Sequence, residues 1–173
     1  MNINYFFLAV SFLLLTILFA FKPLEIKEQP SGDVPLFSIT SFVMYELDIK
    51  GLITTMNGTT ATRYKDRYKV EEIDYTDSSK EYIANMKSKS GVYKDDVVYL
   101  DGNIVYKRED GLTFETQKAT YNKKTTLAIA DGEYLLYRGE NRVIGKGLHY
   151  NSSQETVSSK DVTAKYQIEE RKK

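Results

Sequence analysis

Few side chains in this 173-residue chain are suited to catalysis. His149 is the only histidine and there is no cysteine, so a Ser-His-Asp triad or a multi-histidine metal site cannot be assembled easily. Adjacent carboxylates such as Asp95 and Asp96 would point to opposite faces of a strand, as solvated surface residues do. The sequence therefore predicts no enzyme, no cofactor and no metal site, and it predicts that His149 is an ordinary strand residue.

The stretch from Gly139 to Gly147 is similar to a nucleotide-binding loop but does not match one. A Walker A motif has four residues between its first glycine and Gly-Lys, which is followed by Ser or Thr. Here five residues separate Gly139 from Gly145-Lys146, and Gly147 follows. We expect a turn in this stretch, so any ATP consumed would be bound by a partner protein.

An internal repeat organises the chain. Tyr64, Tyr93, Tyr121 and Tyr150 recur about every 29 residues, and each follows a short phrase that contains small residues. A fixed period of this size indicates one supersecondary unit that is stacked several times and cannot bury its apolar side alone. We expect two strands in each unit, one through the tyrosine and one through an apolar alternation.

The body of the chain has the pattern of a β-sheet. All three prolines lie before residue 36, and proline is what central strands exclude. Two alternating segments have the period of half-buried strands, and their apolar members are Val98, Leu100, Ile104 and Tyr106 in one and Ala128, Ala130, Tyr134 and Leu136 in the other. Asp110-Gly111 predicts a hairpin turn, whereas Asp101-Gly102, Asp131-Gly132 and Asn57-Gly58 are consistent with either a turn or a bulge.

The N-terminal 21 residues contain no charged side chain. A helix of that length spans about 31 Å, enough to cross the hydrocarbon of a bilayer, and the segment fits an uncleaved anchor better than a signal peptide. We therefore predict a transmembrane anchor at 1–21, a linker at 22–35, a β domain at 36–168 and a charged tail at 169–173.

Charge and composition narrow the possible ligands. The 24 basic and 24 acidic residues balance and are dispersed, which argues against nucleic-acid binding. If the sheet stays open, its apolar side forms a trough for lipid chains, which would otherwise expose CH₂ groups to water at about 0.8 kcal/mol each. The same side could instead pack shut as a sandwich core, and the sequence leaves both possibilities open.

Four phrases, taken together with the N-terminal segment, resemble a known family. Residues 43–52 resemble its opening tyrosine, polar turn and glycine, and residues 61–64 its Ala-x-x-Tyr close. Residues 98–104 are similar to its Leu-x-Leu-x-Gly-x-Val phrase, and residues 145–148 to a late glycine-containing phrase. The family is LptC, the inner-membrane component of lipopolysaccharide export, with an OstA-like periplasmic domain.

This resemblance implies a fold and a function. The fold is a twisted, open β-jellyroll that follows one transmembrane helix in the inner membrane, with the C-terminal domain in the periplasm. The implied partners are lipopolysaccharide, an ATP-driven inner-membrane ABC transporter complex, and a soluble periplasmic bridge protein of similar fold. The resemblance assigns the acyl chains to a lining made by Val98, Leu100, Ile104, Tyr106, Ala128, Ala130, Tyr134 and Leu136.

The resemblance also implies residues that bind partner proteins. Gly51 and Gly147 match glycines that matter for complex formation or handover, and Val162, Ala164 and Tyr166 fall on the last, bridge-facing strand. Two alternatives remain open at this point: a periplasmic scaffold or assembly factor that binds no lipid, and the soluble bridge protein itself.

Overall fold

The computed structural model describes Tyr5 and residues 10–16, 34–49 and 51–167. The chain divides into two units, Met1–Ser31 and Gly32–Lys173. Residues 10–16 of the first unit are helical. Among the described residues, no helix has the length and apolar character needed to span a bilayer. Most of the predicted anchor (1–21) and linker (22–35), and all of the predicted tail (169–173), lie outside the described residues.

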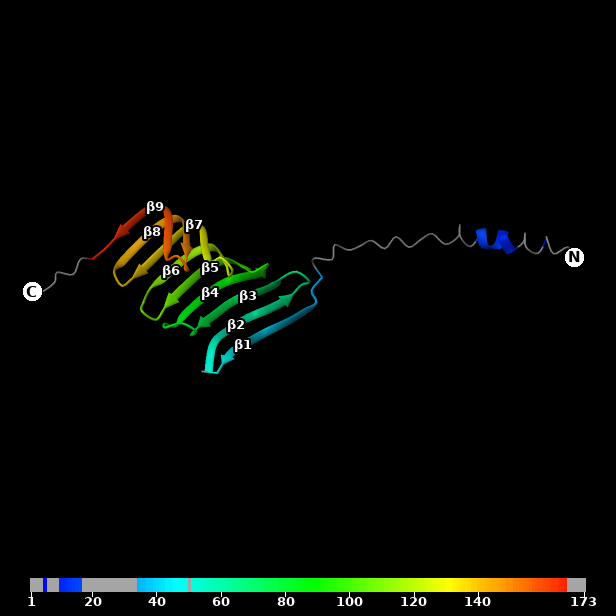
Figure 1. Cartoon of the computed structure of the whole chain (residues 1–173), viewed down its shortest axis with the longest axis horizontal. Coiled ribbons are helices and arrows are strands. Elements are labelled where there is room, and N and C mark those ends of the chain that lie inside the picture. The colour runs from blue at the N-terminus through cyan, green and yellow to red at the C-terminus, as the bar shows by residue number, and fades with distance from the viewer. Residues whose placement is uncertain (1–4, 6–9, 17–33, 50, 168–173) are drawn as a thin grey trace, which may run out of the picture. The chain divides into compact units, whose positions relative to one another are not determined.

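The second unit is a single antiparallel sheet, as expected from the proline-free, alternating sequence. Its nine strands lie side by side in chain order, so that β1 and β9 form the two edges (Figure 1). The sheet is open and jellyroll-like, and the prediction of an all-β domain is confirmed. The strands are β1 (Phe37–Asp48), β2 (Gly51–Arg63), β3 (Tyr68–Asp77), β4 (Ala84–Lys94), β5 (Val97–Arg108), β6 (Thr113–Asn122), β7 (Leu127–Arg138), β8 (Asn141–Asn151) and β9 (Thr156–Lys165).

Short turns join the strands. Asp95 and Asp96 connect β4 to β5 with φ angles of 50° and 62°, and two consecutive left-handed residues match the twist of the flanking strands. At Asp110-Gly111, the Arg108 backbone N–H donates to the Leu112 carbonyl at 2.8 Å, so the hairpin turn predicted there is confirmed. Gly139 and Glu140 form the turn between β7 and β8, but the rest of the Walker-like stretch lies within β8. The prediction of a turn was wrong for that part.

The repeat corresponds to pairs of strands. Tyr93, Tyr121 and Tyr150 each lie next to the last residue of β4, β6 and β8. The first repeat differs: Arg63 is the last residue of β2, and Tyr64 lies just beyond it, in the turn that follows. The expectation of two strands per repeat is therefore confirmed.

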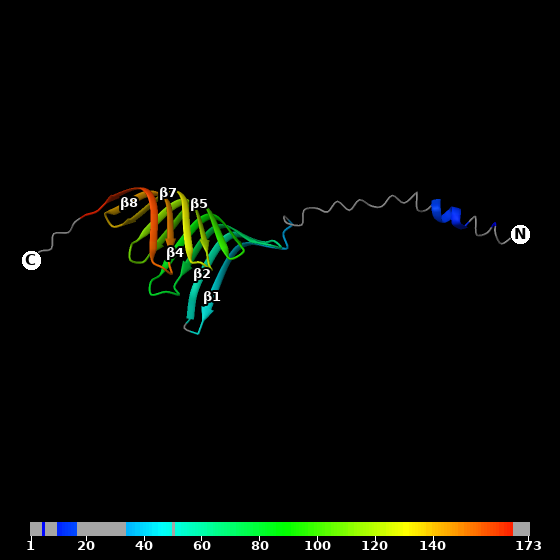
Figure 2. The same ribbon diagram turned by 45° about the horizontal axis from the view of Figure 1, so that its top comes forward.

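The strands bend near their middle, and Figure 2 shows that they curve. The pairing of β5 with β6 shifts between Asp101 and Ile104, and that of β7 with β8 shifts between Ala130 and Glu133. Both Asp-Gly pairs are thus irregularities inside strands and not turns. Asn57-Gly58 lies within β2, where it pairs with β1 in regular register. Left-handed residues mark the bend on several strands: Ser41, Glu72, Asn103, Gly147 and Asp161.

The buried core is small. The buried hydrophobic residues of the described chain all lie on strands β3, β4, β5 and β7: Ile73, Ala84, Ile104, Ala130 and Tyr134. No described side chain is less than 2% exposed. One sheet has no second layer of its own against which to bury an apolar side, so much of that side is left only partly covered.

Candidate functional site

The pairing register arranges one side of the sheet into rows of apolar residues. Residues that pair across antiparallel strands project from the same face. One row runs across all nine strands near one end of the sheet, and we call it the methionine row: Met44, Met56, Tyr75, Met86, Tyr106, Phe114, Leu136, Val143 and Ala164. Every member is apolar or aromatic.

A second row crosses all nine strands at the opposite end, beside the turns that follow the even-numbered strands. We call it the tyrosine row: Phe37, Arg63, Tyr68, Tyr93, Val98, Tyr121, Ala128, Tyr150 and Val157. Three of the four repeated tyrosines belong to it. The first repeat contributes Arg63 in place of Tyr64, because its repeated tyrosine lies one residue beyond the position that pairs in this row.

Two further rows lie between these, one on each side of the bend. The small-residue row consists of Ile39, Ala61, Val70, Gly91, Leu100, Ala119, Ala130 and Leu148. The isoleucine row consists of Phe42, Gly58, Ile73, Ser88, Ile104, Thr116, Tyr134 and Gly145. On every strand its members are two residues from those of the methionine row, so they share its face.

All four rows face the same side despite the bend. A Cβ atom at Gly91, in the small-residue row, would lie 2.5 Å from Cδ1 of Ile73 in the isoleucine row and 3.2 Å from Cδ2 of Leu100. The left-handed residues Ser41 and Glu72 lie between the two middle rows, where they let β1 and β3 change parity without turning their apolar residues outward. We call this combined surface the apolar face.

Burial on the apolar face is deepest at the bend and falls toward both ends. Ile104 and Tyr134 are 2% and 4% exposed, whereas Tyr68 and Tyr121 of the tyrosine row are 45% and 37% exposed. Met44 of the methionine row is also exposed. The two outer rows therefore present apolar surface that the protein itself does not cover.

Tyr134 joins three strands at the bend. Gly145 pairs with it on β8, and a Cβ at Gly145 would lie 2.7 to 2.9 Å from atoms of the tyrosine ring and hydroxyl. The ring lies over this glycine and reaches β9, where its hydroxyl donates to Oγ of Ser159 at 2.9 Å. Phe114 packs beside it with ring centroids 5.8 Å apart. An aromatic ring over a glycine on the next strand covers backbone that would otherwise be exposed.

Tyr106 of the methionine row has the largest pKa shift among these residues. Burial raises the pKa of its hydroxyl well above the usual range, and the nearby Tyr82 raises it further. The hydroxyl therefore stays neutral at any physiological pH, as suits a side chain on an apolar surface.

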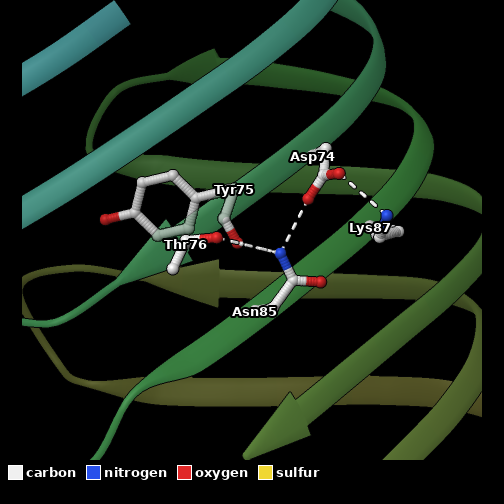
Figure 3. A network of polar contacts seen from close by, with 5 residues as sticks. All are labelled: Asp74, Tyr75, Thr76, Asn85 and Lys87. Atoms are coloured by element: carbon white, nitrogen blue, oxygen red, sulfur yellow. Dashed lines mark hydrogen bonds and ion pairs between the residues drawn. The ribbon is translucent and has the colours of Figure 1, made fainter.

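The opposite side of the same strands carries charged and polar side chains among apolar ones such as Val105 and Ile144. The carboxylate of Asp74 on β3 accepts from Nζ of Lys87 at 2.8 Å and from Nδ2 of Asn85 at 2.7 Å (Figure 3). The same amide nitrogen donates to Oγ1 of Thr76 and to the carbonyl of Tyr75. These contacts, with that from Lys87 the largest, hold the pKa of Asp74 below its usual value. The chemical difference between the two sides follows from the period of two along each strand.

This arrangement suits binding of an extended apolar ligand. The described residues contain no group of three or more His, Asp or Glu side chains placed to hold a metal ion. Two hollows of about 480 and 390 Å³ lie near the bend; the first is lined mainly by polar residues such as Asp74 and Lys87, and the second combines polar residues with apolar ones such as Val92 and Ile129. A hydrocarbon chain is better accommodated along the apolar face, where each buried Å² of apolar surface contributes about 25 cal/mol.

All eight residues predicted to line a trough lie on the apolar face. Val98 and Ala128 are in the tyrosine row, Leu100 and Ala130 in the small-residue row, Ile104 and Tyr134 in the isoleucine row, and Tyr106 and Leu136 in the methionine row. Sequence reasoning missed the members from the other strands. The repeat itself could have found Met56, Met86, Phe114 and Val143, which recur at nearly its period.

The five residues predicted to bind partners lie at turns, at the bend and at an edge. Gly51 opens β2 after the first turn with φ of 122°, and Gly147 lies at the bend of β8 with φ of 62°. Val162 and Ala164 are on β9, which pairs only with β8, and Tyr166 follows that strand. His149 is an exposed residue of β8, so the prediction that it lies in a strand is confirmed.

The edge strands carry exposed apolar side chains. Val43, Met44, Tyr45 and Leu47 of β1 are each at least 47% exposed, as are Val157 and Val162 of β9. An unpaired edge with backbone N–H and C=O groups is a template for another strand. Both ends of the apolar rows therefore finish at an edge that can accept a strand from another protein.

Comparison with known proteins agrees with this geometry. The family model described as lipopolysaccharide-assembly, LptC-related, matches residues 5–167, which include all nine strands. A search of curated proteins gave no match. The chain belongs to the LptC-related family of lipopolysaccharide-assembly proteins.

Proposed function

We propose that this protein carries lipopolysaccharide along its apolar face, between an ATP-driven extractor in the inner membrane and a soluble periplasmic bridge protein. The observation that carries the proposal is the set of four rows that begin at the β1 edge, of which the tyrosine row and the methionine row continue to the β9 edge. The acyl chains lie on these rows and the sugar portion remains in water. No covalent chemistry is required.

The energetics favour such a surface. An acyl chain exposed to water costs about 0.8 kcal/mol for each CH₂ group, so a lipid with several chains does not cross an aqueous compartment unaided. The exposed tyrosine and methionine rows offer apolar contacts on both sides of the bend. A closed sandwich would be weakened by so small a core. A surface that binds a lipid and then passes it to the next protein does not need a deep one.

The two edges give the path a direction. In this proposal the β1 edge, with Gly51 beside it, joins the transporter complex, and the β9 edge, with Val162, Ala164 and Tyr166, joins the bridge protein. Strand pairing at both edges would continue the apolar rows from one protein into the next. Gly147 contributes by allowing β8 to bend, since its φ of 62° disfavours any side chain with a Cβ.

The first 21 residues anchor the protein in the inner membrane, and the β domain lies in the periplasm. The support for this part is the uncharged N-terminal sequence, which is long enough as a helix to cross a bilayer. The anchor keeps the β1 edge near the extractor, and the intervening segment 22–35 acts as a tether.

Photocrosslinking in cells tests the proposal with a matched pair of exposed tyrosines. Tyr121 lies on the apolar face and is 37% exposed, whereas Tyr99 lies on the opposite face and is 47% exposed. A photoreactive residue at Tyr121 should crosslink to lipopolysaccharide, and the same residue at Tyr99 should not. Equal crosslinking at both positions would remove the apolar face as the carrier.

Copurification of the full chain from detergent tests the partners. An ATPase-transporter complex should accompany the chain, and Val162→Pro should weaken capture of the bridge protein without loss of the transporter. Retained partners with no crosslinked lipid at Tyr121 would favour the scaffold alternative. Recovery of a chain that has lost its N-terminal segment would favour the soluble bridge protein.

A further inference from the structure

Arg63 is the only charged residue in the four rows of the apolar face. It ends β2 in the tyrosine row, between Phe37 on β1 and Tyr68 on β3, and its side chain is exposed. Its position is set by the backbone, because its carbonyl accepts from the N–H of Leu36 at 2.8 Å. A guanidinium at the end of an apolar surface lies where an amphiphile changes from hydrocarbon to polar group.

Arg63 is part of a chain of contacts that includes a second cation. Its Cζ lies 5.3 Å from the ring centroid of Tyr68, the rings of Tyr68 and Tyr93 are 6.3 Å apart, and Nζ of Lys123 lies 4.7 Å from the ring centroid of Tyr93. We call these four residues the cation–tyrosine cluster. The two tyrosine rings hold the cations by cation–π contacts.

The two cations of the cluster differ from their neighbours in their electrostatic partners. Lys94 and Lys124, at the same end of the sheet, form ion pairs with Asp66 at 2.7 Å and Asp96 at 2.8 Å. Within the described residues, Arg63 and Lys123 form no ion pair, and both are exposed. The positive charge of Arg63 is thus available to an anion from outside the protein, whereas Lys123 also interacts with the carboxylate of Asp96 and, after Lys124, helps to lower its pKa.

We propose that the cation–tyrosine cluster binds an anionic phosphate on the headgroup of the lipid whose acyl chains lie on the apolar face. This inference rests on the proposed function and goes beyond it by fixing the orientation of the lipid. A guanidinium binds phosphate with two parallel hydrogen bonds, and the ammonium adds a point charge. The headgroup lies at the tyrosine row, and the acyl chains extend from there across the bend toward the methionine row.

The test uses the full chain in neutral detergent with a photoreactive residue at Tyr121. Two probes are compared: lipid A with its phosphates, and the same lipid after enzymatic removal of the phosphates. The lipid concentration for half-maximal crosslinking should be about tenfold or more lower for the phosphorylated lipid, since a charge-assisted hydrogen bond contributes at least this much. Arg63→Gln should remove most of this preference, and Arg63→Lys should keep part of it.

The controls separate the cluster from a general effect of charge or of misfolding. Lys69→Gln removes a cation from the next strand on the opposite face and should leave the preference unchanged. If the Arg63→Gln variant crosslinks to the dephosphorylated lipid as well as the unmodified chain does, the apolar face of the variant is intact. Millimolar inorganic phosphate should not displace the lipid, and its full displacement would overturn the assignment to a lipid headgroup.

The outcomes distinguish this inference from the proposed function. Crosslinking of both lipids at equal concentration would overturn the cluster as a headgroup site and leave lipid carriage standing. A preference for phosphate that survives Arg63→Gln combined with Lys123→Gln would overturn it as well. Crosslinking of neither lipid by the unmodified chain would overturn both.

Discussion

The two middle rows of the apolar face and its two outer rows differ in residue size and in burial: the middle rows are rich in glycine and alanine, and the outer rows in tyrosine and methionine. Ile104 and Tyr134, beside the bend, are almost fully buried, whereas Tyr68, Tyr121 and Met44 in the outer rows retain much of their exposure. The middle rows are covered because the bend brings neighbouring side chains together over Gly91 and Gly145. The comparison suggests a division of roles: the bend stabilises the sheet, and the outer rows are left for a ligand.

The largest expected effect is at the bend itself. Ile104→Ala should destabilise the β domain by about 2–4 kcal/mol, because it leaves a cavity at a buried position. Val98→Ala, on the same strand in the tyrosine row, should cost less than about 1 kcal/mol, since that position is only half-buried. Chemical denaturation of the full chain, followed by circular dichroism, gives both values. Equal losses would contradict the division between middle and outer rows.

The next effect comes from the glycine beneath Tyr134. Gly145→Ala should cost about 1–3 kcal/mol, because its new methyl group would overlap a ring that is held by packing and by a hydrogen bond. Gly132→Ala, on the neighbouring strand with open space around it, is the matched control and should be close to neutral. If both alanines are tolerated equally in thermal unfolding, the contact between ring and glycine does not constrain the bend.

A smaller effect isolates the hydrogen bond that spans β7 and β9. Tyr134→Phe should cost about 0.5–1.5 kcal/mol, since it removes the hydroxyl that donates to Ser159 and keeps the ring. Hydrogen exchange of the β9 amides should rise in this variant. Tyr150→Phe changes an exposed hydroxyl in the tyrosine row, and it should alter neither stability nor exchange. A similar response from both variants would show that the hydroxyl of Tyr134 has no special role.

The smallest effect tests whether surface charges, rather than the bend, maintain the sheet. The pKa of Asp74 is lowered in the folded state, mainly by Lys87 and then by Asn85. Its stabilising contribution is therefore present above the unfolded value near 3.8 and is lost as pH falls through the lowered folded value. The difference in stability between the unmodified chain and Asp74→Asn should be small at neutral pH and vanish in acid. A difference that grows below pH 4 would have the wrong sign for this account.

Much of the fold was predictable from local patterns. The absence of proline after residue 35, the alternation through Val98 to Tyr106 and the tyrosine period were enough to predict strands in pairs. Asp110-Gly111 was recognisable as a turn because its residue types tolerate positive φ. The turn expected near Gly145 was wrong because glycine also serves strands wherever a neighbouring ring approaches closely, as Tyr134 does there.

The candidate site was predictable only in part. The eight expected lining residues all came from β5 and β7, where the bulge lets one parity continue across the bend. On the other strands the apolar residues change parity there: Val70 and Ile73 of β3 share a face although they are three residues apart. A simple period of two assigns such a pair to opposite faces. The alternation that it predicts therefore breaks at the bend, and Tyr75 and Met86, which lie beyond the bend on β3 and β4, were not recognised as part of the site.

The class of the domain and its repeated strand pairs could be predicted from the sequence, because these depend on residue type and on spacing within one or two strands. The three-dimensional fold was needed to show which residues share a face, which of them are covered, and that Arg63 and not Tyr64 belongs to the tyrosine row. The physical reason is that these properties depend on register and on the bend, which couple residues about 30 positions apart through backbone pairing and leave no local signal in the chain.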